Sequence, residues 1–486
     1  MLDGPACSGK GWAEVGGRRR RMTGESTKLP AVILAAGEGL RLQNGANDKP
    51  KPLASLLGLN LLERSILTCC QAGIDEFIVV VGYRKDELIP QIDELREKCG
   101  LSIKVVENPN WQAGNGTSVA ACAPHLSGPF LLLMCDHLFE PEILHDLVAA
   151  DDGSDVCLLG VDRRIGDLFD PDDATMVRLE GAAITAIGKG LDNPDAADTG
   201  FFLCRPLLFP ALEKSRRTGD GSLSGGIRQL SGNGEIQAVD VSGRFWHDID
   251  TPKAFEAGVD GLLERLKTAK RIDGPISRHI NRFFSIKITR RLARYAISPN
   301  QISVVSTLFG LLGAGCFFGA GVIASWHSLW IWGLMGLAGL LIQISSIFDG
   351  VDGEIARLKY QTSPYGAYLD YMLDRYVDGL TVMGMVYASY MLSGSFIIVL
   401  VGFMAVFGLP LSSIHRAKFL AEAKRNYLSE DDGPLRYLPY SRDVRLFAVF
   451  LGGILNKVDL TIYFLALVPN LVALLRLHAV KKAMAK

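Results

Sequence analysis

The sequence predicts two folded parts of different class: an α/β domain with a doubly wound, mostly parallel sheet, followed by an all-α membrane domain of six transmembrane helices. Two observations lead to this prediction. Residues 29–260 alternate short strand-like apolar runs with helical ones, whereas residues 299–480 contain nearly all the long apolar runs. The mean hydropathy of +0.21 is high for a soluble protein. A chain of 486 residues is also long enough for two or three domains.

Charge and cysteine content exclude some classes of protein. The net charge is −1 at pH 7, so the chain has no global field that would attract nucleic acid, and we expect no nucleic-acid partner. The nine cysteines are scattered and form no CxxC pair. An odd, scattered set does not make a disulfide framework, so we expect the cysteines to face a reducing cytosol.

Residues 1–28 are rich in glycine and include four consecutive arginines, Arg18 to Arg21. They contain no apolar run, which excludes a secretory signal. We predict a disordered basic tail, with contact to an anionic membrane surface as the alternative. Met22 follows the arginines, and either Met1 or Met22 can be the start of the protein.

Residues 29–260 are predicted to form the α/β domain. Buried strands of a parallel sheet read as nearly continuous apolar runs, and such runs occupy residues 31–34, 77–82, 103–108, 130–136 and 155–161. Helical patterns lie between them, at residues 58–73 and 141–150. This alternation is typical of a doubly wound sheet.

The first predicted strand continues into a glycine-containing loop, Leu34-Ala35-Ala36-Gly37-Glu38-Gly39-Leu40-Arg41-Leu42. Glycines here let backbone N–H groups approach the phosphates of a nucleotide. No Gly-Lys-Ser/Thr follows, so this is not a Walker loop, and the third glycine of a dinucleotide fingerprint is missing. The loop alone is equally compatible with a plain turn. However, it is followed by Lys49-Pro50-Lys51-Pro52-Leu53.

Together, this loop and the lysine-proline stretch resemble the nucleotidyltransferases that activate sugar phosphates. The resemblance implies that Lys51 neutralises the α-phosphate of a nucleoside triphosphate, with Lys49 as its rival, and that Arg41 contacts the β- and γ-phosphates. It also implies that Leu34, Ala35, Gly37 and Gly39 line the nucleotide. Charge neutralisation and alignment would provide most of the catalysis.

Later segments also match this family. The resemblance implies base contacts from Gly114, Asn115, Gly116 and Thr117, and contacts to the second substrate from Thr199 and Gly200. Asp136 ends a buried strand where the family has a Mg²⁺ ligand. Asp250, in Asp248-Ile249-Asp250-Thr251-Pro252, is expected to complete the metal site, and Asp248 is the weaker match.

Residues 261–298 are predicted to be a basic connector. From Arg265 to Arg294 there are ten Lys or Arg residues and one acid, Asp273. Apolar residues interleave with them, including Phe283 and Phe284. The pattern favours an amphipathic juxtamembrane helix on an anionic leaflet, in contact with membrane lipids. A solvated charged linker is the alternative.

We predict that residues 299–486 form the membrane domain, with spans at about 301–322, 325–348, 366–392, 395–414, 444–457 and 459–479. Basic residues cluster in the connector, in the loops near 357–359 and 415–445, and in the C-terminal tail, whereas the loops near 322 and 394 have no charge. The positive-inside rule then places both termini and both active sites on the cytoplasmic side of the cell membrane.

Four aspartates lie around the junction of the second and third predicted spans: two just after the second span and two in the first turns of the third. Asp349 and Asp352 share a face at the end of one helix, and Asp370 and Asp374 share a face at the start of the next. Ser363-Pro364 lies between them and breaks the helix. Converging carboxylates would repel one another unless divalent cations lay between them, and oxygen ligands suit Mg²⁺ or Mn²⁺. Gly353 and Ala356 leave bare helix surface for a nucleotide.

The pattern D-x2-D-G-x2-A-R-x8-G-x3-D-x3-D resembles the signature of the CDP-alcohol phosphotransferases. All eight positions match, namely Asp349, Asp352, Gly353, Ala356, Arg357, Gly366, Asp370 and Asp374. The resemblance implies that the aspartates bind two metal ions on the diphosphate of a CDP-alcohol, that Asp374 takes the proton of the acceptor hydroxyl, and that the remaining four residues line the nucleotide. It also implies a homodimer. Asp378 continues the spacing beyond the signature.

A basic cluster, His415, Arg416, Lys418, Lys424 and Arg425, gathers at one predicted helix end. It has two interpretations. The cluster could bind an anionic acceptor, or it could only mark the cytoplasmic side of the membrane.

The order of the two predicted domains resembles a family of bifunctional enzymes, the inositol-1-phosphate cytidylyltransferase/di-myo-inositol phosphate phosphate synthases. The resemblance implies that CTP and inositol 1-phosphate give CDP-inositol, which reacts with a second inositol 1-phosphate and releases CMP. One alternative is a phospholipid synthase with a lipid acceptor. The other is a non-catalytic, membrane-anchored nucleotide-binding protein.

Overall fold

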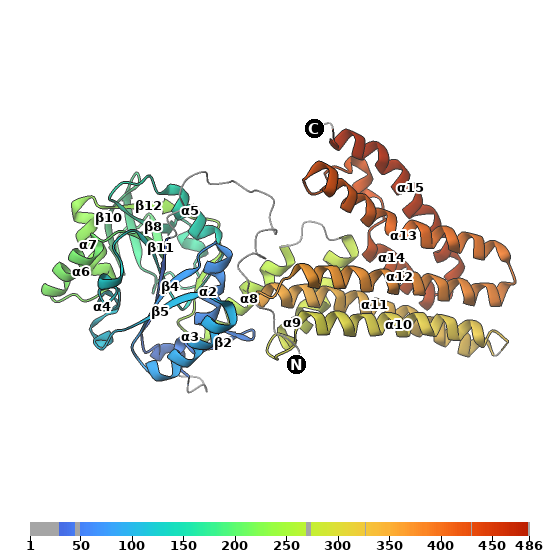
Figure 1. Ribbon diagram of the computed structural model, residues 1–486, viewed down its shortest axis with the longest axis horizontal. Helices are drawn as coiled ribbons and strands as arrows, with labels where there is room; N and C mark the ends of the chain where they lie inside the picture. Colours follow the sequence, from blue (N-terminus) through green and yellow to red (C-terminus); the bar gives the residue numbers. More distant parts are fainter. Residues whose placement is uncertain (1–28, 44–48, 269–273, 326, 429, 485–486) are drawn as a thin grey trace. The chain divides into compact units, whose positions relative to one another are not determined.

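The computed structural model describes residues 29–43, 49–268, 274–325, 327–428 and 430–484. The predicted basic tail therefore lies outside the described residues. The chain forms two compact units, and the described residues divide between them after Gly261 (Figure 1).

The first unit is built on a nine-stranded sheet with the order β5-β4-β1-β6-β11-β8-β12-β10-β9. Its strands are β1 (Ala31–Ala35), β4 (Glu76–Val81), β5 (Ser102–Glu107), β6 (Phe130–Met134), β8 (Cys157–Asp162), β9 (Met176–Glu180), β10 (Ala183–Gly188), β11 (Ala196–Cys204) and β12 (Ile236–Asp240). The five predicted strands are confirmed as β1, β4, β5, β6 and β8. Most of their side chains are buried, as continuous apolar runs require.

The sheet is mixed, so the prediction of a mostly parallel sheet was wrong in this respect. Strands β5, β4, β1 and β6 are parallel neighbours. Strand β11 then runs antiparallel to both β6 and β8. Strands β9 and β10 form a hairpin around Gly181 and Ala182, a connection that requires antiparallel pairing. Because β9 and β10 have only partly apolar sequences, they lack the continuous runs by which the other strands were recognised.

Helices cover this sheet and two short sheets flank it. The helices are α1 (Leu40–Gln43), α2 (Leu61–Gln71), α3 (Lys85–Cys99), α4 (Asn115–Ala120), α5 (Glu142–Ala150), α6 (Leu208–Arg217), α7 (Leu223–Asn233) and α8 (Pro252–Thr268). The helices predicted at 58–73 and 141–150 are α2 and α5. Strand β7 (His137–Phe139) pairs with β13 (Trp246–Asp248), and β2 (Ser55–Leu56) pairs with β3 (Leu59–Asn60).

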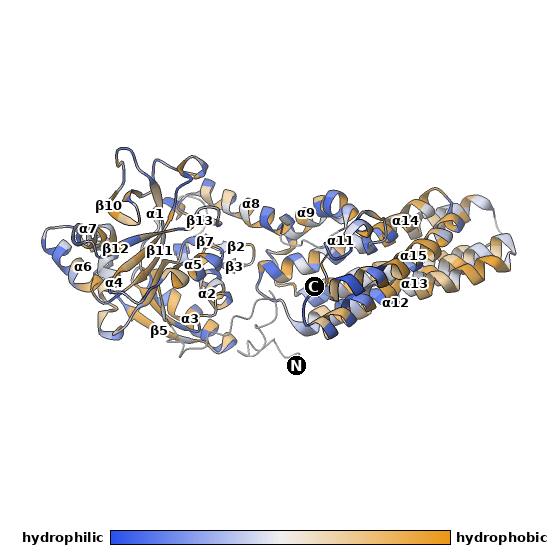
Figure 2. Ribbon diagram, turned by 90° about the horizontal axis from the view of Figure 1, so that it is seen from above, coloured by the Kyte–Doolittle hydropathy of each residue, from blue (hydrophilic) through white to orange (hydrophobic). Residues whose placement is uncertain are grey.

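The second unit consists of helices. They are the short π-helical segment Ser277–Asn281, α9 (Arg282–Leu292), α10 (Pro299–Val322), α11 (Ser328–Leu358), α12 (Pro364–Ser393), α13 (Phe396–Ala423), α14 (Arg442–Ile454) and α15 (Val458–Met484). Figure 2 shows hydrophobic residues along much of these helices. Helix α10 packs closely against both α11 and α12, and α13 packs along α15.

Among the described residues, four helices are long and apolar enough to cross a membrane, namely α10, α11, α13 and α15. The six predicted spans are therefore confirmed only in part. Helix α12 is long, but its first half contains Asp370, Asp374, Arg375 and Asp378. Helix α14 has 13 residues, which at about 1.5 Å per residue is shorter than a bilayer core.

A buried ion pair holds the segment before α14 against α15. Arg476 of α15 is fully buried, and its Nε donates a hydrogen bond to Oδ1 of Asp432 over 2.7 Å. The hydroxyls of Tyr427 and Tyr440 donate to the same carboxylate over 2.9 and 2.7 Å. These hydrogen bonds and the ion pair offset the free-energy cost of burying the carboxylate of Asp432. The pair thereby fixes the chain just ahead of Arg442, the first residue of α14.

Candidate active sites

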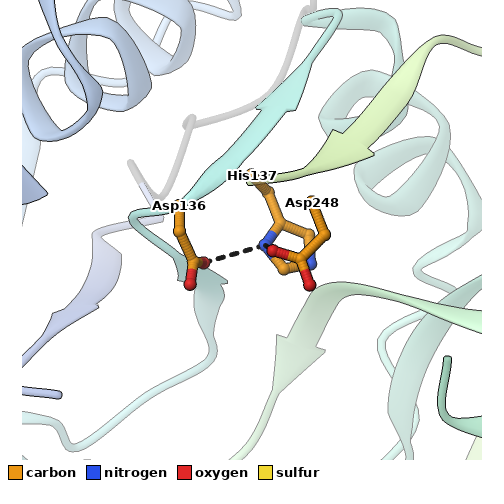
Figure 3. Close-up of side chains that lie close together, drawn as sticks. All are labelled: Asp136, His137 and Asp248. Carbon is orange, nitrogen blue, oxygen red and sulfur yellow. Dashed lines mark hydrogen bonds and ion pairs between the residues drawn. The ribbon is translucent and has the colours of Figure 1, made fainter. Parts of the chain in front are cut away.

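The sheet topology brings the predicted nucleotide-binding residues to one edge. Strands β1 and β6 are parallel neighbours, so the glycine loop after β1 and Asp136 after β6 lie at the same carboxyl edge, where ligands bind in open α/β sheets. Strand β13 pairs with β7, and Asp248 lies opposite His137. Figure 3 shows the side chains of Asp136, His137 and Asp248 meeting at this edge.

Lys51 lies at the centre of this first site. Its side chain is buried, and Nζ lies 2.5 Å from Oδ2 of Asp136 and also pairs with Asp250. Burial opposes its charge, but the carboxylates of Asp136, Asp248 and Asp250 raise the pKa of Lys51 above its usual value. Lys49, its rival, is exposed. The geometry thus favours Lys51 as the cation of the site.

Arg41 extends the positive charge outward. Its guanidinium pairs with Asp250 and with Asp173. Asp173 also pairs with Lys189, over 2.5 Å. Neither Asp173 nor Lys189 belongs to a motif recognised in the sequence, because both lie in the region of β9 and β10 that the strand pattern did not resolve.

Two groups of side chains at this edge of the sheet could hold a cation. A single ammonium group, that of Lys51, contacts both Asp136 and Asp250, so these two predicted ligands lie close enough together to share a metal ion. Ligand atoms of Asp136, His137 and Asp248 also lie within 4.8 Å of one another. These are mainly hard oxygen donors, which fit a divalent cation such as Mg²⁺.

His137 was missed by sequence reasoning, although it follows Asp136 directly. Its Nδ1 donates a hydrogen bond to Oδ1 of Asp136 over 2.9 Å. Burial opposes a positive charge on the His137 ring. The carboxylates of Asp248 and Asp136 outweigh this effect and raise the pKa of His137 to about 9. This hydrogen bond lets His137 orient the carboxylate of Asp136. Although burial opposes ionisation, Lys51 and His137 hold the pKa of Asp136 well below its usual range.

A cavity of about 480 Å³ opens beside these residues. Its walls include the predicted residues Leu34, Gly37, Gly39, Arg41, Lys51, Asn115, Asp136 and Asp250. Gly39 has φ +66°, and a side chain there would collide with Lys51. Ala35 is buried at the end of β1. The structure therefore gathers most of the predicted first site around one cavity.

The remaining predicted residues of this unit have structural contacts. Gly114 has φ +108° at the start of α4, and Gly116 is buried against residues 221–222. Thr117 Oγ1 donates to the carbonyl of Gly114 over 2.7 Å. Thr199 is fully buried and donates to the carbonyl of Gly160 over 2.7 Å, so its side chain does not face the cavity. Gly200 has φ +79°, and a side chain there would meet the ring of His137.

The second site lies where α11 ends and α12 begins. Ser363 caps α12 by accepting a hydrogen bond from the backbone N–H of Gly366 over 3.0 Å. Ligand atoms of Asp349, Asp370 and Asp374 lie within 4.8 Å of one another and offer oxygen donors for a divalent metal. Asp352 is turned toward α10, where Ser303 Oγ donates to its Oδ2 over 2.5 Å. Three of the four predicted carboxylates therefore form the cluster.

Arg442 lies among these carboxylates. Its Nη2 is 2.7 Å from Oδ1 of Asp374, its Nη1 is 3.3 Å from Oδ1 of Asp349, and its Nε is 3.2 Å from Oδ1 of Asp378. No sequence motif indicated this residue, because it comes from α14, nearly seventy residues beyond Asp374 in the chain. Asp378 also pairs with Arg375 over 3.3 Å.

A cavity of about 260 Å³ adjoins this cluster, and five arginines line it, namely Arg282, Arg375, Arg416, Arg442 and Arg445. From the predicted basic cluster only Arg416 is among its lining residues. Lys418 pairs with Glu422, and Arg425 pairs with Asp431. Gly353, Ala356 and Arg357 are half-buried on the last turns of α11.

Comparisons with known proteins match each of the two units to a family. Residues 31–231 match the family model of the MobA-like NTP transferase domain, and residues 296–475 match that of the CDP-alcohol phosphatidyltransferases. The fold and the two sites thus define a membrane enzyme with a nucleotidyltransferase domain and a CDP-alcohol phosphotransferase domain.

Relatives that span nearly the whole chain share this arrangement. The chain is 38% identical to the "Bifunctional IPC transferase and DIPP synthase" of Rubrobacter xylanophilus, over 93% of this chain and 96% of the relative. It is 31% identical to the protein of that name from Aquifex aeolicus, over 93% and 98% of the two chains. The chain belongs to the family of bifunctional IPC transferases and DIPP synthases. The predicted resemblance to bifunctional enzymes is confirmed.

A solved structure also resembles the first unit. It is the inositol-1-phosphate CTP transferase from T. maritima, which is 27% identical, with a TM-score of 0.44, over 48% of this chain and 97% of that chain.

Proposed function

We propose that this enzyme makes CDP-inositol from CTP and inositol 1-phosphate, and then transfers the inositol phosphate group to a second inositol 1-phosphate. The products would be di-myo-inositol phosphate phosphate and CMP. One observation carries the proposal: two separate acidic sites, each beside its own arginine- or lysine-lined cavity, occur in one chain whose relatives are named for two linked activities.

In the first reaction, a phosphate oxygen of inositol 1-phosphate attacks the α-phosphorus of CTP. The bond from this phosphorus to the bridging oxygen breaks, and diphosphate leaves. Lys51 would neutralise the α-phosphate, and Arg41 the departing phosphates, because both cations line the same cavity. Asp136 and Asp250 would hold Mg²⁺, or Mn²⁺, whose chemistry is to neutralise the triphosphate.

The base and the alcohol would be held by different segments of the first unit. The segment Gly114, Asn115, Gly116 and Thr117 would contact the base. Gly200 lies beside His137 and would line the alcohol. Lys189 pairs with Asp173, the partner of Arg41, and would offer a cation for the phosphate of inositol 1-phosphate. Thr199 would support this segment from the core rather than touch the substrate.

In the second reaction, a hydroxyl of the acceptor attacks the β-phosphorus of CDP-inositol. Its proton passes to Asp374, and CMP leaves when the bond between the β-phosphorus and the bridging oxygen breaks. Asp349 and Asp370 would hold the Mg²⁺ ions, whose chemistry is to neutralise the diphosphate. Asp352 would join them only with its carboxylate turned away from Ser303. Gly353, Ala356, Arg357 and Gly366 would line the cytidine nucleotide.

The acceptor is proposed to be a soluble phosphorylated alcohol rather than a lipid. The cavity beside the aspartates is lined by arginines, and Nε and Nη1 of Arg375 are buried without a hydrogen-bond partner among the described residues. Nε of Arg416 is also buried without a hydrogen-bond partner among the described residues. Buried donors without partners are costly, and a phosphate group would satisfy them.

Further features of the proposal concern organisation. We assign residues 29–260 to the cytidylyltransferase domain, 261–298 to the juxtamembrane connector and 299–486 to the membrane domain. Helix α12 packs against α10 and α13, which supports a position within the bilayer, and α14 packs against α11 and α15. The basic loops support a cytoplasmic location for both sites. The family resemblance supports a homodimer.

The test supplies CTP, Mg²⁺ and a panel of alcohol phosphates to the detergent-solubilised enzyme and identifies the products by mass spectrometry. We expect CDP-inositol, then CMP and a water-soluble phosphodiester, all lost when a chelator is added. A product that extracts into organic solvent would instead indicate a phospholipid synthase. Bound nucleotide without turnover for any alcohol would indicate a non-catalytic protein.

The cytidylyltransferase domain is expected to act without the membrane domain. Residues 29–260 contain the complete nine-stranded sheet and every residue of the first site. We expect this fragment to be soluble without detergent and to form CDP-inositol from CTP. Size-exclusion chromatography and diphosphate release would check this. A folded fragment that releases no diphosphate would show that the first site needs residues beyond 260.

A further inference from the structure

Helix α9 is attached to α11 by a buried carboxylate, that of Glu354. Glu354 has no exposed surface, and it lies between Gly353 and Ala356 of the nucleotide-lining face. Ser285 Oγ and Thr289 Oγ1 donate hydrogen bonds to its two oxygens over 2.7 and 2.6 Å. Nη1 of Arg282 pairs with it over 3.4 Å.

The same interface has polar contacts above and below Glu354. Asn281 Nδ2 donates to Ser346 Oγ over 3.0 Å, and Gln343 Nε2 donates to Asn281 Oδ1 over 2.7 Å. Lys359 Nζ donates to the backbone carbonyls of Tyr295 and Ile297 over 2.6 and 3.3 Å. From residue 343 to 359, these contacts follow about 24 Å of α11.

Hydrogen bonds to a buried carboxylate restrict the position of α9 on α11 more than apolar contacts would. Burying a carboxylate is costly unless its oxygens receive hydrogen bonds, so sliding or rotating α9 would leave Glu354 uncompensated. The residues of α9 that turn away from α11 include exposed aromatic side chains. Phe283 and Phe284 are exposed, and Lys287 lies over the ring of Phe283.

The docked segment forms one wall of the second cavity. Ser277, Asn281, Arg282 and Ser285 line it together with Asp349 and the arginines of α12 and α14. The match to the CDP-alcohol phosphatidyltransferase family model begins only at residue 296. This wall therefore comes from chain that precedes the matched domain.

We propose that Glu354 is a positioning residue for phosphotransfer: it fixes α9 as the wall of the acceptor cavity, so that Arg282 and Ser285 face the phosphorylated acceptor. The inference rests on the proposed second reaction. It adds that acceptor binding depends on α9, which precedes the domain that contains the signature. Glu354, which holds α9 in place, is not one of the eight signature residues.

The first test is Glu354→Gln in the full-length enzyme, assayed with CDP-inositol and inositol 1-phosphate. Glutamine has the same size but loses the charge that holds three donors. We expect the KM for inositol 1-phosphate to rise about tenfold or more, because charged buried hydrogen bonds are lost. The kcat and the KM for CDP-inositol should change by less than about threefold. Glu422→Gln, an exposed glutamate paired with Lys418 on α13, is the matched control and should change none of these values.

The second test measures docking directly. A β-carbon at Gly350 would lie 3.5 Å from Cβ of Ser285, within the range of disulfide-linked β-carbons. Gly350→Cys with Ser285→Cys should therefore crosslink readily under mild oxidation, as detected by mass spectrometry of the digested protein. Ser285→Cys removes one donor to Glu354, so Thr289 and Arg282 hold the carboxylate in this double variant. Adding Glu354→Gln should still slow the crosslinking several-fold, because the charge that these two residues pair with is then lost.

The outcomes separate the two proposals. An unchanged KM for inositol 1-phosphate in Glu354→Gln, or crosslinking at the original rate, would overturn the role of Glu354. If that variant aggregates, Thr289→Val takes its place, because it removes one donor to Glu354 and leaves the residues that line the cavity unchanged. If the unmodified enzyme releases no CMP from CDP-inositol, the proposed second reaction fails, while the crosslinking rates still decide whether Glu354 docks α9.

Discussion

Lys51→Ala should lower diphosphate release from CTP by at least about a hundredfold, the effect of removing a buried group that stabilises charge in the transition state. The ammonium group of Lys51 pairs with Asp136 and Asp250 inside the cavity that we assign to CTP. Alanine would therefore remove the charge that faces the α-phosphate and leave two carboxylates to repel it. The measurement is the rate of diphosphate release with inositol 1-phosphate as the second substrate.

The same variant should keep the second activity when CDP-inositol is supplied, because the second site lies in the other compact unit. Lys49→Ala is the matched control, since Lys49 is an exposed lysine two residues away. We expect it to retain most of the diphosphate release. Loss of CMP formation in Lys51→Ala would contradict two separate sites, and a larger defect in Lys49→Ala would exchange the roles of the two lysines.

Asp374→Asn is expected to lower the rate of CMP release from CDP-inositol by about 10²–10⁴-fold, which is typical for the loss of a general base. Asparagine keeps the shape of the side chain and one oxygen ligand but cannot accept the proton of the acceptor hydroxyl. Binding of CDP-inositol and Mg²⁺ should weaken much less. The measurement is the single-turnover rate as a function of Mg²⁺ concentration.

Asp349→Asn is the comparison for this prediction. It belongs to the same carboxylate cluster but is proposed only as a metal ligand. Its defect should be mainly in metal affinity, so excess Mg²⁺ should restore part of the rate. If excess Mg²⁺ instead restores Asp374→Asn, the roles assigned to these two aspartates are reversed.

The parts of the fold that the sequence predicted are those with local signals. Strands such as β1 and β6 are continuous apolar runs, and α2 follows a capping asparagine, Asn60, whose Oδ1 accepts from the N–H of Glu63 over 2.7 Å. The insertion of β11 between β6 and β8 depends on pairing between residues far apart in the chain, which no local pattern encodes. For this reason the sheet was predicted as mostly parallel and is mixed.

The candidate sites divide in the same way. Arg41, Lys51, Asp136 and Asp250 belong to recognisable motifs, and the structure brings all four to one cavity. Arg442 and Glu354 could not be recognised, because their importance arises only from the packing of α14 and α9 against α11. Asp352 was recognised from the sequence but does not join the cluster. Its helical spacing is correct, but its carboxylate turns to Ser303. Spacing predicts a shared face of a helix, not the direction of each side chain.

The position of Arg442 has a consequence for how the enzyme is assembled in the cell. The guanidinium contacts Asp349, Asp374 and Asp378, so the carboxylates have a counter-ion that is part of the chain. A single positive charge among several carboxylates offsets part of the repulsion that would otherwise oppose packing of these helices. The membrane domain therefore carries in its own chain a charge that helps its helices to pack around the carboxylates.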